Sequence, residues 1–232
     1  MRTPRVAVTT AADRLSSLSE TVRRHRMEPV ALPCVEVVAV GGRNDERIRR
    51  EAQRADWIVV TSARAVAYAW PDGGMPDVPV AAVGPATAAA VVAAGGRVEV
   101  VGEAGAADLV DRLFDRIQHR KVVFPHAMGA NPETVTELAR AGAQVIALPV
   151  YETRPLAPAR DLVDAVLFGS PSSVEGWTRS RSLHDLVVAA IGGTSADAVA
   201  RHGAEAHVVA TRPDFDLLVS ELGRYLRERS PV

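Results

Sequence analysis

The chain has 232 residues, enough to bury a substantial core as one large domain or two small ones. Hydrophobic residues make up 47% and charged residues 24%, and no uncharged apolar run approaches the roughly 20 residues that cross a bilayer, so we expect no membrane span. The formal net charge is −1 and no basic stripe is interleaved with aromatic residues, which argues against nucleic acid as a partner.

Strand-like and helix-like segments alternate along the whole chain. Short apolar runs predict buried strands, and apolar residues recurring every three or four positions predict helices between them. Residues 41–45 read as a turn. We expect strands at 5–10, 56–62, 79–83, 97–101, 120–125, 164–168, 186–191 and 204–210, and helices at 11–26, 46–54, 63–70, 88–94, 106–118, 132–140, 171–177, 196–202 and 214–227.

Two extended segments interrupt this alternation. Residues 29–40 and 145–155 both contain internal prolines, which suit edge or connecting strands better than central ones. The N-terminus passes into its first strand without an apolar leader, so we expect a cytoplasmic protein.

The sequence contains an internal repeat. A strand, a glycine-containing turn, a helix and a second glycine occur twice, and Gly84 and Gly95 are each offset by 108 positions from Gly192 and Gly203. Such self-similarity predicts a duplicated chain. Because strands alternate with helices in both copies, we expect two small doubly wound parallel sheets with helices on both faces.

The turns that follow the predicted strands are small, hydroxylic and free of acidic residues. Ligands of open parallel sheets bind beyond the carboxyl ends of the strands, where helix N-termini direct free N–H groups. Serine and threonine also cap helices, which accounts for any single turn. Five such turns together favour an anionic ligand with several charged groups. The candidates are Thr9, Thr10, Thr61, Ser62, Ala63, Gly84, Thr87, Ser170, Pro171, Ser172, Gly192, Thr194 and Ser195.

Other catalytic constellations are missing from the sequence. There is no phosphate-binding Gly-x-x-x-x-Gly-Lys-Ser/Thr loop, no Gly-x-Gly-x-x-Gly and no Gly-x-Ser-x-Gly. The histidines lack metal-ligand spacing, and of them only His126 falls at a predicted strand end, as a weak site candidate. Cys34 is expected to be a small buried hydrophobe, and Lys121, the only lysine, a cation at the start of a strand.

An ordered set of motifs resembles the uroporphyrinogen-III synthase family. Each motif alone is weak, but together they extend the resemblance from Val6 to Leu222. The motifs are DWIVVTSARAV from Asp56, AVGPATA from Ala82, PVYET from Pro149, DAVLFGSPSSV from Asp164 and AIGGT from Ala190.

The resemblance implies two α/β lobes joined by a two-stranded β linker, with a ligand cleft between the lobes. Lobe one would comprise 1–35 plus 154–232 and lobe two 36–153. The linker strands would lie at about 32–40 and 148–155, within the two proline-containing segments. Periodicity alone would assign one lobe to each repeat, whereas the resemblance implies lobes that mix the two halves of the chain.

The resemblance also implies a reaction. The family closes the linear tetrapyrrole hydroxymethylbilane, which carries eight carboxylates, to uroporphyrinogen III, with inversion of ring D and loss of water. No metal or organic cofactor is implied. The expected protein is a monomer that binds this small molecule, contacts neither nucleic acid nor membrane, and is open to transient contact with the preceding pathway enzyme.

The family motifs assign roles to particular residues. Tyr151 matches the tyrosine of a Tyr-x-Thr motif and is the expected proton donor to the leaving hydroxyl, although a tyrosine is also an ordinary residue of a linker strand. The chain departs from the family at Thr10, Gly193 and Arg64, and either Arg14 or Arg64 is expected to bind a substrate carboxylate in place of a family residue. The alternative function is a non-catalytic anion-binding or regulatory module with the same two-lobed scaffold.

Overall fold

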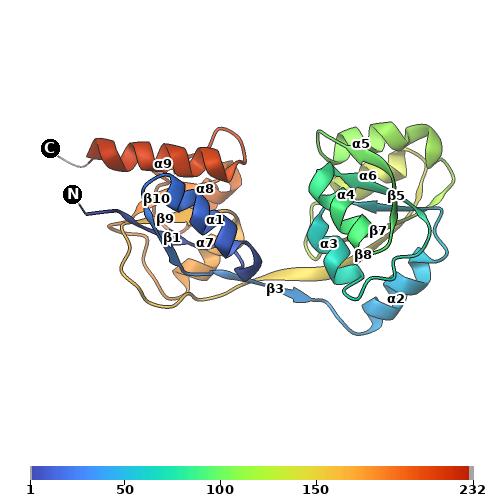
Figure 1. The fold of residues 1–232 in the computed structure, drawn as a ribbon, viewed down its shortest axis with the longest axis horizontal. Coiled ribbons are helices and arrows are strands. Elements are labelled where there is room, and N and C mark those ends of the chain that lie inside the picture. The colour runs from blue at the N-terminus through green and yellow to red at the C-terminus, as the bar shows by residue number, and fades with distance from the viewer. Residues whose placement is uncertain (1, 230–232) are drawn as a thin grey trace. The chain divides into compact units, whose positions relative to one another are not determined.

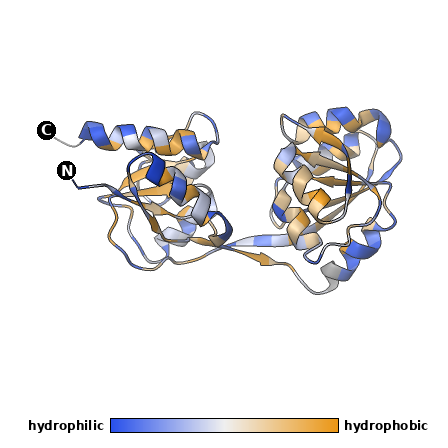
Figure 2. Cartoon of the chain, viewed as in Figure 1, coloured by the Kyte–Doolittle hydropathy of each residue, from blue (hydrophilic) through white to orange (hydrophobic). Residues whose placement is uncertain are grey.

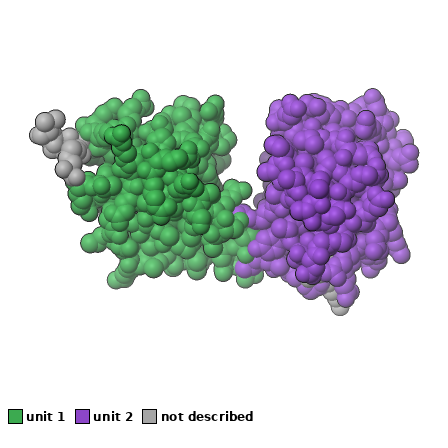
Figure 3. Space-filling view, in the orientation of Figure 1, with its two compact units in different colours: residues 1–37, 153–232 green, residues 38–152 purple. Residues whose placement is uncertain are grey.

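The chain forms two compact α/β units. The computed structural model describes residues 2–229, with the backbone alone for Arg43, Asn44 and Asp45. Unit 1 comprises Met1–Val37 and Thr153–Val232, and unit 2 comprises Val38–Glu152 (Figure 3). Among the described residues, no helix is long and apolar enough to cross a membrane.

Unit 1 contains a five-stranded parallel sheet in the order β11-β10-β9-β1-β2 (Figure 1). Ala7 of β1 lies opposite Val30 of β2 on one side and Val166 of β9 on the other. The elements are β1 (Arg5–Val8), α1 (Ala12–Arg24), β2 (Glu28–Ala31), β9 (Ala165–Phe168), α7 (Pro171–Thr178), β10 (Val187–Ala190), α8 (Gly193–Arg201), β11 (Val208–Val209) and α9 (Phe215–Arg229).

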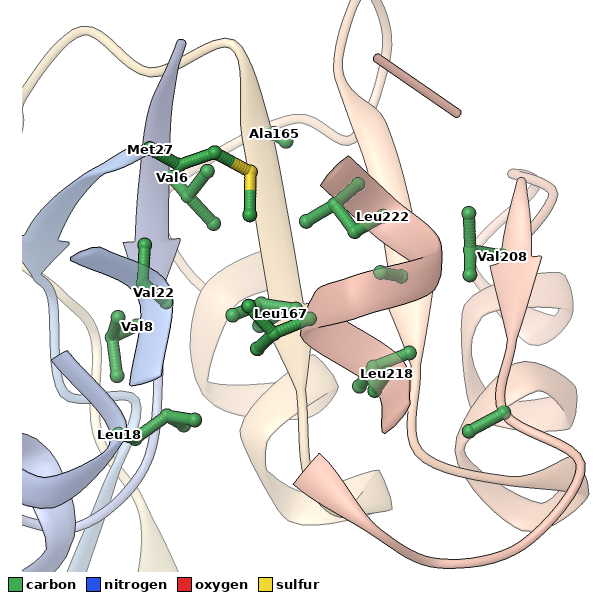
Figure 4. Packing of buried hydrophobic residues seen from close by; sticks show 13 residues of the cluster. Val6, Val8, Leu18, Val22, Met27, Ala165, Leu167, Val208, Leu218 and Leu222 are labelled. Atoms are coloured by element: carbon green, nitrogen blue, oxygen red, sulfur yellow. The ribbon is translucent and has the colours of Figure 1, made fainter. Parts of the chain in front are cut away.

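Helices cover both faces of this sheet because successive strand residues point to opposite sides. Val6 and Val8 pack with Leu18 and Val22 of α1 and with residues of α9 such as Leu222 (Figure 4). Ala7 instead belongs to a second cluster with Phe168, Trp177 and Val199, from β9, α7 and α8. The two clusters account for the hydrophobic strands and the mixed helix surfaces visible in Figure 2.

Unit 2 contains a second sheet in the order β3-β8-β7-β4-β5-β6. Ile58 of β4 lies opposite Val80 of β5 and Val123 of β7, all in parallel strands. The elements are β3 (Val35–Ala39), α2 (Arg43–Ala52), β4 (Trp57–Val60), α3 (Ala63–Ala69), β5 (Pro79–Val83), α4 (Gly84–Ala93), β6 (Arg97–Gly102), α5 (Ala106–Leu113), the 3₁₀ helix η1 (Phe114–Arg116), β7 (Lys121–Ala127), α6 (Glu133–Arg140) and β8 (Gln144–Pro155).

The core of unit 2 also has two sides. Trp57 and Val59 of β4 pack with Leu109 of α5 and Leu138 of α6. Helices α3 and α4 pack against β5, β6 and β7, and alternation directs Ile58 and Val60 to their side. The prediction of parallel sheets with helices on both faces is therefore confirmed in each unit.

Two strands carry the chain from one unit to the other. β3 pairs with β8, and the partners run in opposite directions: Leu156 N–H donates to the Cys34 carbonyl at 2.7 Å, and Val40 N–H to the Val150 carbonyl at 3.1 Å. The extended segment expected at 29–40 is divided between the two sheets: β2, at the edge of one, ends at Ala31, and β3, at the edge of the other, begins at Val35. Pro33 lies between them without ending the hydrogen bonds to the β1 segment, because Leu32 N–H donates to the Val8 carbonyl and Cys34 N–H to the Thr9 carbonyl, both at 3.0 Å.

Some element boundaries also differ from the sequence prediction. α2 begins at Arg43, three residues before the predicted start. Gly41 and Gly42, with φ of 63° and 68°, complete the turn in two residues, so the helix begins at once. The helix expected at 106–118 ends at Leu113 and continues as η1, and the strand expected at 204–210 is reduced to Val208–Val209.

Candidate functional site

In unit 2, the candidate residues gather at one edge of the sheet. β8, β7, β4 and β5 are neighbours. His126, Thr61 and Gly84 lie at the carboxyl ends of β7, β4 and β5, and Tyr151 of β8 lies opposite Ala127, the last residue of β7. The carboxyl ends of parallel strands meet at the same edge, where the following helices begin. The topology thus brings together residues that lie up to 90 positions apart in the chain.

Unit 1 has an equivalent edge of its own. β10, β9 and β1 are neighbours, and the residues that follow them are Gly192, Ser170 and Thr9 with Thr10. The repeat accounts for the similarity, because β4–α3–β5–α4 of unit 2 corresponds to β9–α7–β10–α8 of unit 1. Each unit therefore contains one copy of the repeated motif.

Two of the candidate serines cap their own helices. The Ser62 hydroxyl accepts a hydrogen bond from Ala65 N–H at 3.1 Å, and the Ser170 hydroxyl accepts one from Ser173 N–H at 3.2 Å. Ser173 completes a capping box by accepting from Ser170 N–H at 3.3 Å. Capping thus accounts for these two serines. Half-buried in the same turns are Thr61, Ala63, Arg64, Pro171 and Ser172.

The helices α4 and α8 begin differently, because no side chain caps either of them. Gly84, the first residue of α4, has a φ of 74°, a conformation that favours glycine. Gly192 precedes α8 with an extended backbone. Neither first turn contains an acidic residue, so the positive ends of both helices are uncompensated and suited to an anion. Thr87 is buried within α4, and Thr194 is exposed at the start of α8.

Ser195 has a buried hydroxyl without a hydrogen-bond partner among the described residues. Its residue is only 1% exposed, and it is the third residue of α8. A buried unpaired hydroxyl costs about 1–3 kcal/mol, which calls for an explanation such as a ligand or water at this helix end. Ser173, at the third position of α7, is equally buried, but its hydroxyl donates a hydrogen bond to the Ser170 carbonyl.

This contrast makes a matched pair of predictions. Ser195→Ala removes an unsatisfied group, so we expect the unfolding free energy without ligand to rise by about 1 kcal/mol. Ser173→Ala removes the two hydrogen bonds of the Ser173 hydroxyl, from Ser170 N–H and to the Ser170 carbonyl, and should lower the unfolding free energy by about 1 kcal/mol. Urea denaturation of both variants measures the difference, and a loss of stability in Ser195→Ala equal to that in Ser173→Ala would show that the Ser195 hydroxyl has a partner.

Thr9 and Thr10 lie differently at the end of β1. Thr9 is fully buried, and its hydroxyl donates to the carbonyl of Leu167 in β9. The Thr9 side chain therefore holds the sheet together in this structure, and its hydroxyl does not reach the surface. Thr10 is half-buried and follows it at the edge.

Tyr151 is held in place by an aromatic contact. It lies in β8, is 9% exposed, and its ring stacks on Tyr68 of α3 with centroids 5.4 Å apart and an interplanar angle of 29°. Its carbonyl accepts a hydrogen bond from Met128 N–H at 2.7 Å. The sequence analysis missed Tyr68, which reads as an ordinary apolar-face residue of a short helix. The stack restricts the Tyr151 side chain, as expected of a group that must be positioned.

His126, Cys34 and Lys121 have structural surroundings. The His126 ring stacks on Phe124, a member of the cluster on the α5 and α6 side. Burial raises the pKa of the Cys34 thiol to about 12, so it remains protonated and unreactive at neutral pH. Lys121 forms an ion pair with Glu51 at 2.8 Å, as expected of a cation that begins a strand. Within residues 2–229, no three His, Cys, Asp or Glu side chains are grouped to hold a metal.

Sequence comparisons relate the chain to one family. A family model described as uroporphyrinogen-III synthase HemD matches residues 16–220. The chloroplastic uroporphyrinogen-III synthase of Oryza sativa subsp. japonica is 26% identical over 247 aligned residues, which cover 97% of this chain and 81% of the relative.

Solved structures share the fold. The uroporphyrinogen-III synthetase of Helicobacter pylori has a TM-score of 0.65 at 16% identity, over 97% of this chain and 100% of that one. A mutant uroporphyrinogen III synthase from Thermus thermophilus has a TM-score of 0.59 at 18% identity, with the same coverage. At these identities the likeness shows the fold alone.

Proposed function

We propose an activity from one premise: the chain belongs to the uroporphyrinogen-III synthase family, whose model matches residues 16–220. The proposed reaction is the closure of hydroxymethylbilane to uroporphyrinogen III, with inversion of ring D and loss of water. The protein is thus a cyclising lyase of tetrapyrrole and heme biosynthesis. Its substrate is a flexible linear tetrapyrrole that carries eight carboxylates.

The uncapped starts of α4 and α8 are the observation that best supports this assignment. A polyanion requires several positive or N–H-rich positions, and each unit offers one at the carboxyl edge of its sheet. Because helix ends supply the charge, the chain can bind a polyanion while its own net charge is −1. We propose that each edge binds substrate carboxylates, through Gly84 and Thr87 in unit 2 and through Gly192, Thr194 and Ser195 in unit 1.

The remaining candidate residues are proposed to add charge to these turns, to cap helices or to contact the substrate. Arg64 lies in the first turn of α3, where its charge adds to the positive end of the helix. Ser62 and Ser170 contribute through the turns that they cap, together with Thr61, Ala63, Pro171 and Ser172. Thr10 is the proposed contact after β1, and Thr9 fixes that turn by its bond to Leu167.

The chemistry requires a proton at the leaving hydroxyl. We assign it to the phenol of Tyr151: the proton passes to the substrate hydroxyl, the carbon–oxygen bond breaks, and water leaves. The carbocation is stabilised by its pyrrole ring and is attacked by a pyrrole carbon, which then loses a proton that restores the phenol. The substrate can also lose its hydroxyl and close unaided without inversion. The protein must therefore chiefly impose geometry on the chain of rings.

Supplying the purified chain with enzymatically generated hydroxymethylbilane tests the assignment against the non-catalytic alternative. We expect the initial rate of ring closure to exceed the spontaneous rate in proportion to protein concentration, over many turnovers per molecule. A non-catalytic anion-binding module would bind the bilane without accelerating closure. Cofactor independence, a cytoplasmic location, a monomeric state and transient contact with the preceding pathway enzyme stay predictions.

A further inference from the structure

Unit 1 contains a cavity far from its candidate edge. Its volume is about 750 Å³, and it is lined by residues that precede β1, by the turn between α1 and β2, and by the last turns of α9. These segments lie at the amino-terminal ends of β1 and β2, whereas Thr9 and Thr10 lie at the carboxyl ends. A four-residue strand separates the two edges by about 13 Å, so the cavity is separate from the proposed catalytic site.

Basic side chains dominate the cavity wall. Arg2, Arg24, Arg26 and Arg227 all line it, together with His25. Arg2 pairs with Asp164 and Arg24 with Asp216, at 2.5 and 3.0 Å. Neither Arg26 nor Arg227 forms an ion pair within residues 2–229. Among the described residues, at least two arginines of the cavity wall thus have no carboxylate paired with them, and Met27 and Leu226 add apolar surface to the lining.

Arg26 occupies a backbone position that usually belongs to glycine. Met27 N–H donates to the Val22 carbonyl and Arg26 N–H to the Arg23 carbonyl, so α1 ends in a Schellman motif. Arg26 adopts the left-handed conformation this motif requires, with a φ of 61°. The equivalent positions after α4 and α8 are Gly95 and Gly203. An arginine here costs about 1 kcal/mol relative to glycine, and helix-end geometry alone does not require it.

Gly223, which also lines the cavity, is a second residue that local helix preferences do not explain. It lies inside α9, where glycine costs about 1 kcal/mol relative to alanine. A Cβ there would come within 3.3 Å of an Arg227 guanidinium nitrogen and 3.5 Å of the Met27 methyl carbon. Glycine thus keeps room for the Arg227 guanidinium beside the cavity. The favourable interaction of cations with helix C-termini accounts for Arg24 and Arg227. It does not account for the left-handed Arg26 or for Gly223.

We propose that this cavity binds a small molecule with a phosphate or diphosphate group, separately from the catalytic substrate. The forked guanidinium groups of Arg26 and Arg227 match the oxygens of a phosphate and can each donate two hydrogen bonds to it. Pro4, Met27 and Leu226 provide an apolar surface for the organic part of such a ligand. The inference does not depend on the proposed synthase activity.

Calorimetric titration with inorganic pyrophosphate at constant ionic strength tests the proposal. We expect saturable binding of one ion per chain with a Kd below about 1 mM. Arg26→Gly should raise the Kd at least about tenfold while leaving the melting temperature unchanged or higher, because it relieves the left-handed arginine. Arg227→Gln should weaken binding to a similar extent.

Two control arginines lie nearby without lining the cavity. Arg23 in α1 and Arg224 in α9 are exposed, and Arg23→Gln and Arg224→Gln each remove the same single charge. We expect these variants to change the Kd less than about threefold, as a general electrostatic effect. Absence of saturable binding would overturn the proposal, as would equal weakening by cavity and control variants. Ring-closure activity should be the same in Arg26→Gly and the unaltered protein, which separates this site from the catalytic one.

Discussion

Replacing Tyr151 by phenylalanine should lower the kcat for hydroxymethylbilane by at least about 10²-fold and change KM less than about threefold. The variant keeps the ring that stacks on Tyr68 and removes only the hydroxyl that donates a proton, a contribution of about 10²- to 10⁴-fold in typical general-acid catalysis. A change confined to kcat marks an interaction made in the transition state. Single-turnover kinetics with enzymatically generated substrate provide the measurement.

Two further tyrosine variants provide controls for this result. Tyr225→Phe alters a tyrosine of α9 in unit 1, away from both candidate edges, and should leave kcat unchanged. Tyr68→Leu keeps the Tyr151 phenol but removes its stacking partner, so kcat should fall less than in Tyr151→Phe. Tyr68 is then a positioning residue, and Tyr68→Phe should restore the rate. Unchanged turnover in Tyr151→Phe would remove Tyr151 from the mechanism.

Replacing Gly176 by alanine should destabilise unit 1 by about 3 kcal/mol or more. Gly176 lies in α7 where the helix meets the two crossing segments of the chain. An alanine Cβ would lie 1.9 Å from the Cys34 carbonyl oxygen and 2.7 Å from that of Leu156. Both contacts are with backbone, which cannot turn aside as a side chain can, so the helix must shift and core packing is lost. Leu156 N–H also donates to that Cys34 oxygen.

Gly193→Ala is the matched control for Gly176→Ala. Gly193 is the first residue of α8, and a Cβ there would meet no atom within 4 Å. Its stability should remain within about 0.5 kcal/mol of the unaltered protein. Urea denaturation of both variants measures the difference, and a Gly176→Ala variant as stable as Gly193→Ala would show that α7 does not pack against these strands as described.

The hydrophobic pattern predicted much of the fold because the central strands are buried on both faces. Trp57–Val60 and Ala165–Phe168 are wholly buried, so their uninterrupted apolar runs are easily identified. The boundary between β2 and β3 was not predicted, because it marks a change from one sheet to the other and depends on which strand lies alongside. Pro29 lies in the edge strand β2, where a missing N–H is tolerated, and Pro33 is tolerated likewise, since Leu32 and Cys34 on either side of it still donate to the Val8 and Thr9 carbonyls.

The sequence predicted which residues lie in the turns of the candidate site, but not which of them cap a helix and which leave a helix end free. Ser62 and the start of α4 looked equivalent in the sequence, because composition does not reveal whether a hydroxyl caps its own helix. The structure separates them: α3 and α7 are capped, and α4 and α8 are not. The contact between Tyr68 and Tyr151 joins a helix and a strand distant in sequence, so only the topology reveals it.

The central claim is that the protein controls the geometry of ring closure, and the isomer composition of the product tests it most directly. Enzymatically generated hydroxymethylbilane is supplied to the purified chain, and the oxidised products are separated by chromatography beside an enzyme-free control. We predict mainly the type III isomer with the protein present and the type I isomer in the control. Type I product alone in both samples would contradict the assignment.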